Sequence, residues 1–584
     1  MVFIRVLPCG TLFFIPRIRR DFMKLWRRWA AVMLALAVCA SLLAGCEKDE
    51  EGISLAVCLG SEPASLDPIY ATAEGDQTIV THLYENLMRV TVDVSGSASV
   101  SNGMAKSYTA ENNHDGTVTW TFRLRGAKWS DGRAVKAEDF VYAWRRLADP
   151  ASGSPYASIL SIVAGYDEVR ATGDTSLLQV SARNDSTLEV VLTGDYDWFL
   201  TDVCTSPATS PLREDVVVRL RDAAVERNKA AEAETGTAGT EKWWSQTEKL
   251  VTNGPYQVGT YTAGESLTLT DYPKYYGSHS GPEKLAFRFA GSAEEAQALY
   301  DEGAVDLVWP LTEERMAELA ENENWVPATT LGTYTLLLNC GRDVFSDPLV
   351  RQALVTAIDR ETVARAAGVA ARAAEGMVPP GVPGGGEGDF RTDNALLDND
   401  PETYPDRCAQ ARELLEDAGY DRGADLGELE YLYEDTPENA AVAQALAQQW
   451  KQVLGVTVTP VAVTKKELRT ALKEGTYTLA GLDVRAFGND AECFLMPWTS
   501  GSENNYARYE NSAYDTLLSI IARAEVGSAR MGCLHDAEVL LLEDSAVAPL
   551  YTTVTAWTVR ETLTGVCRDA RGWFSLSGVT VHSA

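Results

Sequence analysis

At the sequence WSDGRAVKAEDFVYAWRRLADP, residues 129–150, the spacing of the apolar residues changes from that of a strand to that of a helix. The stretch that leads into it, 117–132, alternates apolar and polar residues and ends in Ser-Asp-Gly, which predicts a strand followed by a turn. After the turn Phe140, Trp144 and Leu147 recur at i, i+4 and i+7, which is the period of an amphipathic helix. Acidic residues stand in the first turn of this helix, two arginines stand near its end, and a proline follows, as the helix dipole and helix termination favour.

Similar patterns continue on both sides of this stretch. Residues 53–59 alternate as a strand does, and 251–277 predicts two strands joined around Ala263-Gly264. Residues 345–367 predict a helix with Asp347 as N-cap, and two more amphipathic helices are predicted at 408–420 and 439–455, the second followed by a β-branched strand. Residues 222–242 are polar and rich in Ala and Glu, which indicates a solvated surface insertion. Helices and strands alternate without an internal repeat, so we expect mixed α/β domains.

The beginning of the chain resembles a secretory signal. A basic cluster of Lys24, Arg27 and Arg28 precedes an apolar run that ends at SLLAGCEKDE, residues 41–50. A transmembrane anchor is the alternative, but the run is shorter than the roughly 20 residues that cross a bilayer. Leu43-Ala44-Gly45-Cys46 is similar to the bacterial lipobox, whose cysteine is lipidated and becomes the first mature residue. We therefore expect a signal segment at 1–45, with Met23 as a possible true start, and a lipid-anchored linker at 46–51.

The composition limits the classes of function. The chain has 584 residues, 45% of them hydrophobic, and a formal net charge of −32, which describes an acidic globular protein of two or three domains. Residues 1–45 hold seven Lys/Arg and one Asp, so the expected mature chain carries −38. Such an acidic surface argues against nucleic acid and against charge-driven binding to anionic lipid.

No motif indicates a cofactor, a metal or catalysis. Cys9 and Cys39 lie in the expected signal segment, and Cys46 is the expected lipidation site. The other seven cysteines are scattered and predict neither a disulfide framework nor a zinc site. The five histidines share no metal-ligand spacing, and the Gly-rich stretch 378–390 lacks the ending of a phosphate-binding loop. A secreted hydrolase is one alternative, but the sequence has no Gly-x-Ser-x-Gly and no His-Glu-x-x-His. We therefore expect no enzyme activity and no cofactor.

The stretch 129–150 closely resembles the signature of the bacterial extracellular solute-binding proteins of the oligopeptide, dipeptide and nickel class, which serve ABC transporters. The resemblance continues in register over most of the chain after residue 52. The stretches that carry it are GSEPASLDP (60–68), 253–277, 345–363, WKQVLGVTV (450–458), 504–518 and DSAVAPLY (544–551).

The resemblance implies a two-lobed α/β clamshell with an additional inserted domain. Mapped onto this sequence, lobe one would comprise 52–75, 200–335 and 555–584. The inserted domain would be 76–199 and lobe two 336–554. Ligand would be enclosed when the lobes close about a hinge.

The family pairs the backbone of a peptide with extended segments from both lobes. The matching segments here are Cys58–Pro63 and Asp483–Phe487. The expected ligand-binding residues are Gly60, Ser61, Glu62, Pro63, Asp483, Val484, Arg485, Ala486, Phe487 and Asp490.

One residue departs from the pattern of the peptide binders. Where these proteins place an aspartate for the ammonium group of the ligand, this chain has Phe487. A phenyl ring offers only a cation–π contact of about 1–2 kcal/mol, so either Asp483 or Asp490 takes over or the ligand lacks a free amine.

Together these features predict a monomeric, lipid-anchored protein on the outer face of the cytoplasmic membrane that captures peptides and delivers them to permease subunits of an ABC importer. Alternatives on the same scaffold are an oligosaccharide, a metal chelate or haem as cargo, and a peptide sensor that imports nothing.

Overall fold

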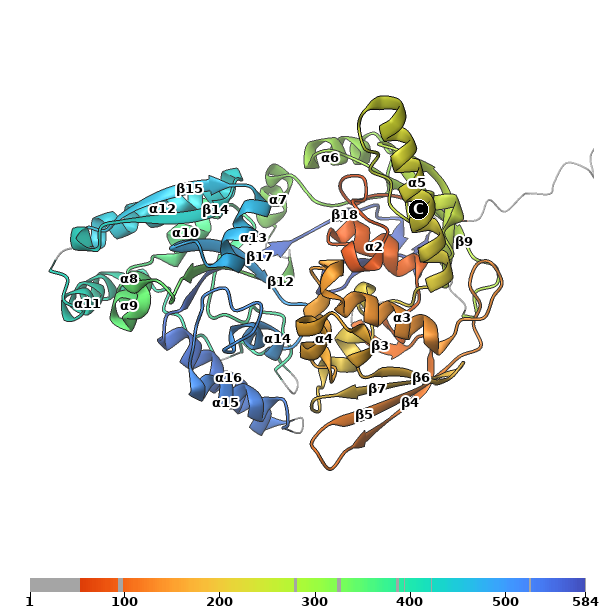
Figure 1. The fold of residues 1–584 in the computed structure, drawn as a ribbon. Coiled ribbons are helices and arrows are strands. Elements are labelled where there is room, and N and C mark those ends of the chain that lie inside the picture. Colours follow the sequence, from red (N-terminus) through yellow and green to blue (C-terminus); the bar gives the residue numbers. More distant parts are fainter. Residues whose placement is uncertain are drawn as a thin grey trace, which may run out of the picture. The chain divides into compact units, whose positions relative to one another are not determined.

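The computed structural model describes residues 53–92, 98–277, 281–322, 327–384, 388–392, 394–421, 423–524 and 527–582. The expected signal segment 1–45, the linker 46–51 and Cys46 lie outside the described residues. The described chain is a mixed α/β structure (Figure 1). It has two six-stranded sheets, one four-stranded sheet and three two-stranded sheets.

The first six-stranded sheet has the order β18-β11-β1-β10-β9-β8. Its strand β1 runs parallel to both neighbours, β10 and β11, and Leu55 and Val57 of β1 are fully buried. Parallel pairing on both edges places β1 in the interior of the sheet, which explains its apolar alternation. The strands are β1 (Ser54–Cys58), β8 (Tyr256–Thr262), β9 (Ser266–Asp271), β10 (Lys284–Arg288), β11 (Leu307–Val308) and β18 (Thr558–Val559).

The second six-stranded sheet has the order β13-β17-β12-β16-β14-β15. Its longest strand, β12, runs antiparallel to both β16 and β17, whereas β14 runs parallel to β15 and β16. The strands are β12 (Ala328–Leu338), β13 (Ala371–Ala373), β14 (Glu428–Glu434), β15 (Thr457–Val463), β16 (Leu479–Arg485) and β17 (Val547–Thr555).

The four-stranded sheet has the order β4-β5-β7-β6, and helix α3 (Ala137–Ala148) packs on strands β6 and β7 (Figure 1). Phe140, Trp144 and Leu147 of α3 are fully buried, as the helical period predicts. The indole of Trp129 donates a hydrogen bond to Asp139 at 3.0 Å and so fixes the turn before the helix. The strands are β4 (Ala105–Asn112), β5 (Val118–Leu124), β6 (Val180–Asn184) and β7 (Thr187–Leu192).

Buried side chains divide the structure into two lobes. One continuous core extends from β1 through the four-stranded sheet to the C-terminal segment, so we call this whole assembly lobe one. Two further cores, on the sheet that contains β12, make up lobe two. The four-stranded sheet therefore shares its core with lobe one.

The chain passes between the lobes after β11 and again after β17. The two crossings contact each other, because the indole of Trp309 donates a hydrogen bond to the hydroxyl of Thr555 at 2.9 Å. Helix α7 (Glu313–Ala320) lies in the first crossing.

The single helix predicted at 345–367 was wrong, because the structure has α9 (Pro348–Thr356) and α10 (Arg360–Ala367). Asp347 caps α9 as expected, and Asp359 accepts a hydrogen bond from the backbone of Thr362 and begins a new helix. The expected surface insertion at 222–242 is helical up to Thr235, where α5 (Glu214–Thr235) ends.

The remaining helices and strands cover the sheets or connect them. They are α2 (Glu74–Leu83), α4 (Tyr166–Thr172), α5 (Glu214–Thr235), α6 (Ala293–Asp301), α8 (Asp343–Ser346), α11 (Tyr404–Asp417), α12 (Pro437–Val453), α13 (Lys465–Glu474), α14 (Glu492–Leu495), α15 (Ser512–Ile521), α16 (Ser528–Glu543), β2 (Met88–Val92), β3 (Ala98–Asn102), β19 (Leu563–Thr564), β20 (Cys567–Arg568), β21 (Phe574–Ser575) and β22 (Thr580–Val581).

Candidate ligand-binding site

The first predicted segment, Gly60 to Pro63, follows directly on β1. Gly60 has a φ of 95°, which few residues with a side chain adopt, and its carbonyl accepts a hydrogen bond from the backbone of Ala290 at 3.0 Å. Ser61 is exposed and Pro63 is buried. Ser61 is therefore the most exposed residue of this segment.

The Glu62 carboxylate is bound by other residues of lobe one. It accepts hydrogen bonds from the hydroxyl of Tyr261 and from the backbone of Gly264 at 3.0 Å, both near the turn between β8 and β9. This carboxylate therefore fixes the segment after β1 against the β8–β9 hairpin.

The second predicted segment forms the end of β16 and has one open edge. Leu479 to Arg485 pair with β12 along one side, down to Arg485 opposite Gly332. On the other side β14 pairs only with Leu479 and Ala480. Within the described part of the chain, the β16 backbone from Gly481 to Arg485 thus has no strand on its second edge.

Arg485 lies at the end of that edge and connects the lobes. Its Nε donates to Asp483 at 2.6 Å, and its Nη1 lies 3.7 Å from Glu74 on α2 of lobe one. Glu74 also accepts two hydrogen bonds from Arg568, at 2.7 and 3.1 Å. Burial raises the pKa of Glu74, and the charges of Arg568 and Arg485 oppose that rise.

Phe487 packs against lobe one. The backbone of Ala486 donates to Leu331 at 3.2 Å, and the next residue, Phe487, places its ring 5.3 Å from that of Trp198 with the planes tilted by 59°. The half-buried Phe487 side chain belongs to the periphery of the lobe-one core. The ring is therefore part of the contact between the lobes.

Both acids that could replace the missing aspartate already have an arginine partner. Asp490 forms an ion pair with Arg530 at 3.0 Å, and Asp483 forms the ion pair with Arg485 that is described above. Arg530 is almost fully buried. A ligand ammonium would have to compete with a guanidinium at either acid.

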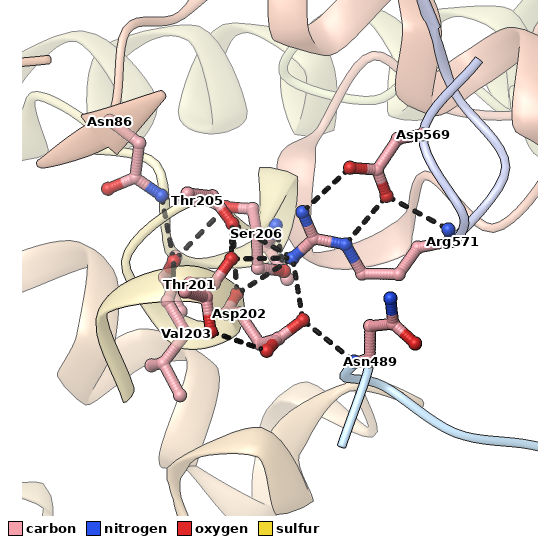
Figure 2. A network of polar contacts seen from close by, with 11 residues as sticks. Asn86, Thr201, Asp202, Val203, Thr205, Ser206, Asn489, Asp569 and Arg571 are labelled. Carbon is pink, nitrogen blue, oxygen red and sulfur yellow. Dashed lines mark hydrogen bonds and ion pairs between the residues drawn. The ribbon is translucent and has the colours of Figure 1, made fainter. Parts of the chain in front are cut away.

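Several residues that sequence reasoning missed join the lobes next to this segment (Figure 2). The backbone of Asn489 donates to Asp202 at 2.8 Å, and Arg571 lies 3.3 Å from the same carboxylate oxygen. Arg571 also donates to Asp569 at 2.8 Å and to the hydroxyl of Thr205 at 2.8 Å. Burial raises the pKa of Asp202, and the charge of Arg571 opposes that rise. These residues are far apart in the sequence and form no motif, so no sequence signal could have found them.

A second buried contact lies beside the first. The indole of Trp198 donates to Glu492 at 3.0 Å, and Arg530 donates to the same carboxylate at 2.8 Å. Burial raises the pKa of Glu492 to about 7, although Arg530 acts in the opposite direction. We call Trp198, Asp202, Asn489, Glu492, Arg530 and Arg571 the interlobe junction.

The lobes also touch through α4. Tyr166 donates to Glu503 at 2.9 Å, and Arg170 donates to the other oxygen of the same carboxylate at 3.1 Å. Tyr166 and Arg170 belong to lobe one and Glu503 to lobe two. We call this contact the α4 clasp.

The described residues contain no group of three or more His, Cys, Asp or Glu side chains that could hold a metal ion. Among them, no helix combines the length and the apolarity that a membrane span requires.

Comparison with known proteins identifies the family. Residues 99–506 match the model of the bacterial extracellular solute-binding proteins, family 5, middle region. The chain belongs to this family. The periplasmic oligopeptide-binding protein OppA of Salmonella typhimurium is 30% identical over 86% of this chain and 87% of its own length. The probable deoxycholate-binding periplasmic protein YgiS of Escherichia coli is 29% identical over 84% of this chain and 86% of its own.

A solved structure also matches the fold. The crystal structure of Haemophilus influenzae OppA in complex with the peptide RPPGFSPFR has a TM-score of 0.71 and 27% identity, covering 91% of this chain and all of that one. The two-lobed α/β solute-binding fold expected from the sequence is therefore confirmed.

Proposed function

We propose that this chain is the extracytoplasmic receptor of an ABC importer, that it captures oligopeptides between its lobes, and that it delivers them to permease subunits. Its relatives in Salmonella typhimurium and Haemophilus influenzae carry the name oligopeptide-binding protein. It acts by capture and release and catalyses no reaction.

The open edge of β16 carries this proposal. An extended peptide can add to an unpaired strand edge through main-chain hydrogen bonds, which do not depend on the peptide's side chains. Gly481 to Arg485 offer such an edge, and Arg485 and Phe487 next to it contact lobe one. The proposed ligand-binding residues are Gly60, Ser61, Glu62, Pro63, Asp483, Val484, Arg485, Ala486, Phe487 and Asp490.

The proposed site has a defined place in the chain. We propose the division expected from the sequence: 52–75, 200–335 and 555–584 for lobe one, 76–199 for the inserted domain and 336–554 for lobe two. In the names used above, lobe one includes the inserted domain, because the two share a core, and lobe two includes all of β12, which begins at Ala328. Lipidation of Cys46 would hold the protein at the outer face of the membrane beside its permease, since two or more acyl chains anchor stably where one does not.

A ligand without a free amine is the second candidate. Phe487 replaces the expected aspartate, and Asp483 and Asp490 are both paired with arginines. One relative bears the name deoxycholate-binding protein, and deoxycholate is a carboxylic acid that has no amine.

Ligand-induced stabilisation distinguishes the two candidates. Binding to the folded state alone adds about 2.7 kcal/mol to stability at a hundredfold excess of ligand over Kd, which raises the melting temperature measurably. We expect a pool of di- to hexapeptides to raise it, and native mass spectrometry of the protein as purified to show a bound peptide. A rise with bile acids, oligosaccharides or metal chelates and none with peptides would refute the peptide assignment.

A further inference from the structure

Glu492 lies at the contact between the two lobes. It begins α14 of lobe two, and its hydrogen-bond partner Trp198 is buried in the core of lobe one. The ring of Phe487, also from lobe two, packs on the same indole at 5.3 Å. Separation of the lobes at this contact therefore transfers the Glu492 carboxyl group from the interior of the protein to water.

The cation that contacts Glu492 is already neutralised by another acid. Arg530 binds Asp490 with both terminal nitrogens, at 3.0 and 3.2 Å, which is the paired geometry of a strong arginine–carboxylate contact. Its Nη2 also donates to Glu492 at 2.8 Å, and its Nε lies 4.0 Å from Asp197 of lobe one. One guanidinium thus faces three carboxyl groups, and full ionisation of all three would leave negative charge uncompensated in a buried place.

The other groups around Glu492 supply no positive charge. Burial raises the pKa of Tyr196 in lobe one to about 12 and the pKa of the Cys493 thiol well above its usual value, so both are neutral. Beside them Arg571 contacts both Asp202, at 3.3 Å, and Asp569, at 2.8 Å. The charged groups that meet here are therefore Arg530 and Arg571 on one side and Asp197, Asp202, Asp490, Glu492 and Asp569 on the other.

Glu492 is the acid of this cluster best placed to hold a proton. Its side chain is 2% exposed, against 18% for Asp490 and 28% for Asp197, so ionisation of Glu492 costs the most desolvation. Trp198 and Arg530 both donate to its Oε2, so a proton on Oε1 costs neither hydrogen bond. The neutral carboxyl group therefore keeps the contact between the lobes and removes one of the excess charges.

We propose that the interlobe junction is a proton-dependent latch, in which Glu492 takes up one proton from solvent when the lobes close and returns it when they open. Ligand is therefore held more tightly at acidic than at neutral pH. The inference rests on the proposed capture of ligand between the lobes and adds a regulation of that step.

The sign of the effect follows from linkage. With the lobes closed, burial raises the pKa of Glu492 from 4.5 to about 7, and exposure to water in the open state returns the pKa to its ordinary value. Between these two values closure takes up a proton, and above them closure must bury a charge. We therefore expect ligand affinity to fall about tenfold as the pH rises from 5.5 to 7.5.

Calorimetric titration in buffers of different ionisation enthalpy measures the proton directly. The probe is RPPGFSPFR, the peptide in the Haemophilus influenzae OppA structure, titrated at pH 6.5 in phosphate and in imidazole. The difference in heat between the buffers gives the number of protons taken up on binding. We expect about half a proton to one proton for the wild type.

Glu492→Gln separates the latch from other titrating groups. The glutamine oxygen still accepts from Trp198 and Arg530 but binds no proton, so proton uptake should fall by at least about half and the change in Kd from pH 5.5 to 7.5 to less than about threefold. Asp76, whose pKa burial also raises to about 7, is present in both proteins. Glu474→Gln, at an exposed position on α13, should keep the wild-type values.

Binding of the peptide without proton uptake, or uptake retained in full by Glu492→Gln, would overturn the latch and leave the proposed function standing. Failure of the peptide to bind at any pH would count against the proposed function instead. In that case small-angle X-ray scattering of the ligand-free protein decides on the latch. A larger radius of gyration at pH 8 than at pH 5.5 in the wild type, and not in Glu492→Gln, supports the latch, whereas an unchanged radius overturns it.

Discussion

Replacing Glu492 by Gln should change how the stability of this protein depends on pH. Glu492 is buried in the interlobe junction between the indole of Trp198 at 3.0 Å and Arg530 at 2.8 Å. Asp490 and Asp197 also face Arg530, at 3.0 and 4.0 Å. Burial raises the pKa of Glu492 from 4.5 to about 7. The glutamine amide oxygen can still accept the hydrogen bond from Trp198.

The sign and the size of the effect follow from linkage. Between pH 4.5 and about 7 the folded protein holds a proton on Glu492 that the unfolded chain has lost, so this residue lowers stability progressively as the pH rises. Below pH 4.5 both states hold the proton and the cost vanishes. Above pH 7 the cost reaches its full value, which at about 1.4 kcal/mol per pH unit is about 3 kcal/mol. Glu492→Gln removes this titration, so it should gain up to about 3 kcal/mol relative to the wild type between pH 5 and pH 8.

Urea unfolding at pH 5, 6, 7 and 8, followed by tryptophan fluorescence, measures this difference. Burial also raises the pKa of Asp76 to about 7, but Asp76 is present in both proteins, so its contribution cancels. Glu474→Gln removes one negative charge from an exposed position on α13 and serves as the matched control. A difference in unfolding free energy between Glu492→Gln and wild type that stays constant from pH 5 to pH 8 would refute the reasoning.

Three further predictions concern the ligand and the anchor. Phe487→Asp removes the contact with Trp198 and should make the site favour a free-amine tetrapeptide over its N-acetylated twin at least about tenfold, whereas the wild type should distinguish them little. A strong wild-type preference that disappears in Asp483→Asn or Asp490→Asn would contradict this. Glu503→Gln breaks the α4 clasp and should speed ligand release about two- to fivefold in stopped-flow experiments, because exposed ion pairs contribute about 0.2–1 kcal/mol. Glu510→Gln, at an exposed position nearby, should leave the release rate unchanged. Cys46→Ala should move the protein from the membrane fraction to the soluble fraction, and a variant that stays membrane-bound would exclude the lipid anchor.

Local patterns in the sequence predicted the elements that short-range forces determine. The buried face of α3 follows from the spacing of Phe140, Trp144 and Leu147, and the β8–β9 turn follows from Ala263-Gly264. The break between α9 and α10 could not be seen in the same way. The apolar pattern continues through Ala357 and Ile358, and only the hydrogen bond from the Thr362 backbone shows that Asp359 caps a new helix.

The candidate site was predictable only in part, because its chemistry depends on contacts across the chain. The resemblance to the family identified 483–487 as a ligand-binding segment and showed that Phe487 stands where the peptide binders have an aspartate. It did not reveal that Asp490 is paired with Arg530, or that Asn489 and Arg571 meet at Asp202. These partners are separated by dozens to hundreds of residues, and an arginine that pairs with a distant acid has the same local sequence signature as one on the surface.

The shared core of lobe one has a consequence for the order in which the protein can fold as it is made. Strand β18 completes the first sheet beside β11, and Phe574, Leu576 and Val579 near the C-terminus are fully buried in the core that contains β1. The sheet of lobe two needs only residues 328–555. Lobe two can therefore reach its final structure while synthesis is still under way. Lobe one contains the first described strand of the chain, yet it must wait until residues 558–579 have emerged, and a truncation before residue 574 should leave it open to proteolysis with lobe two intact.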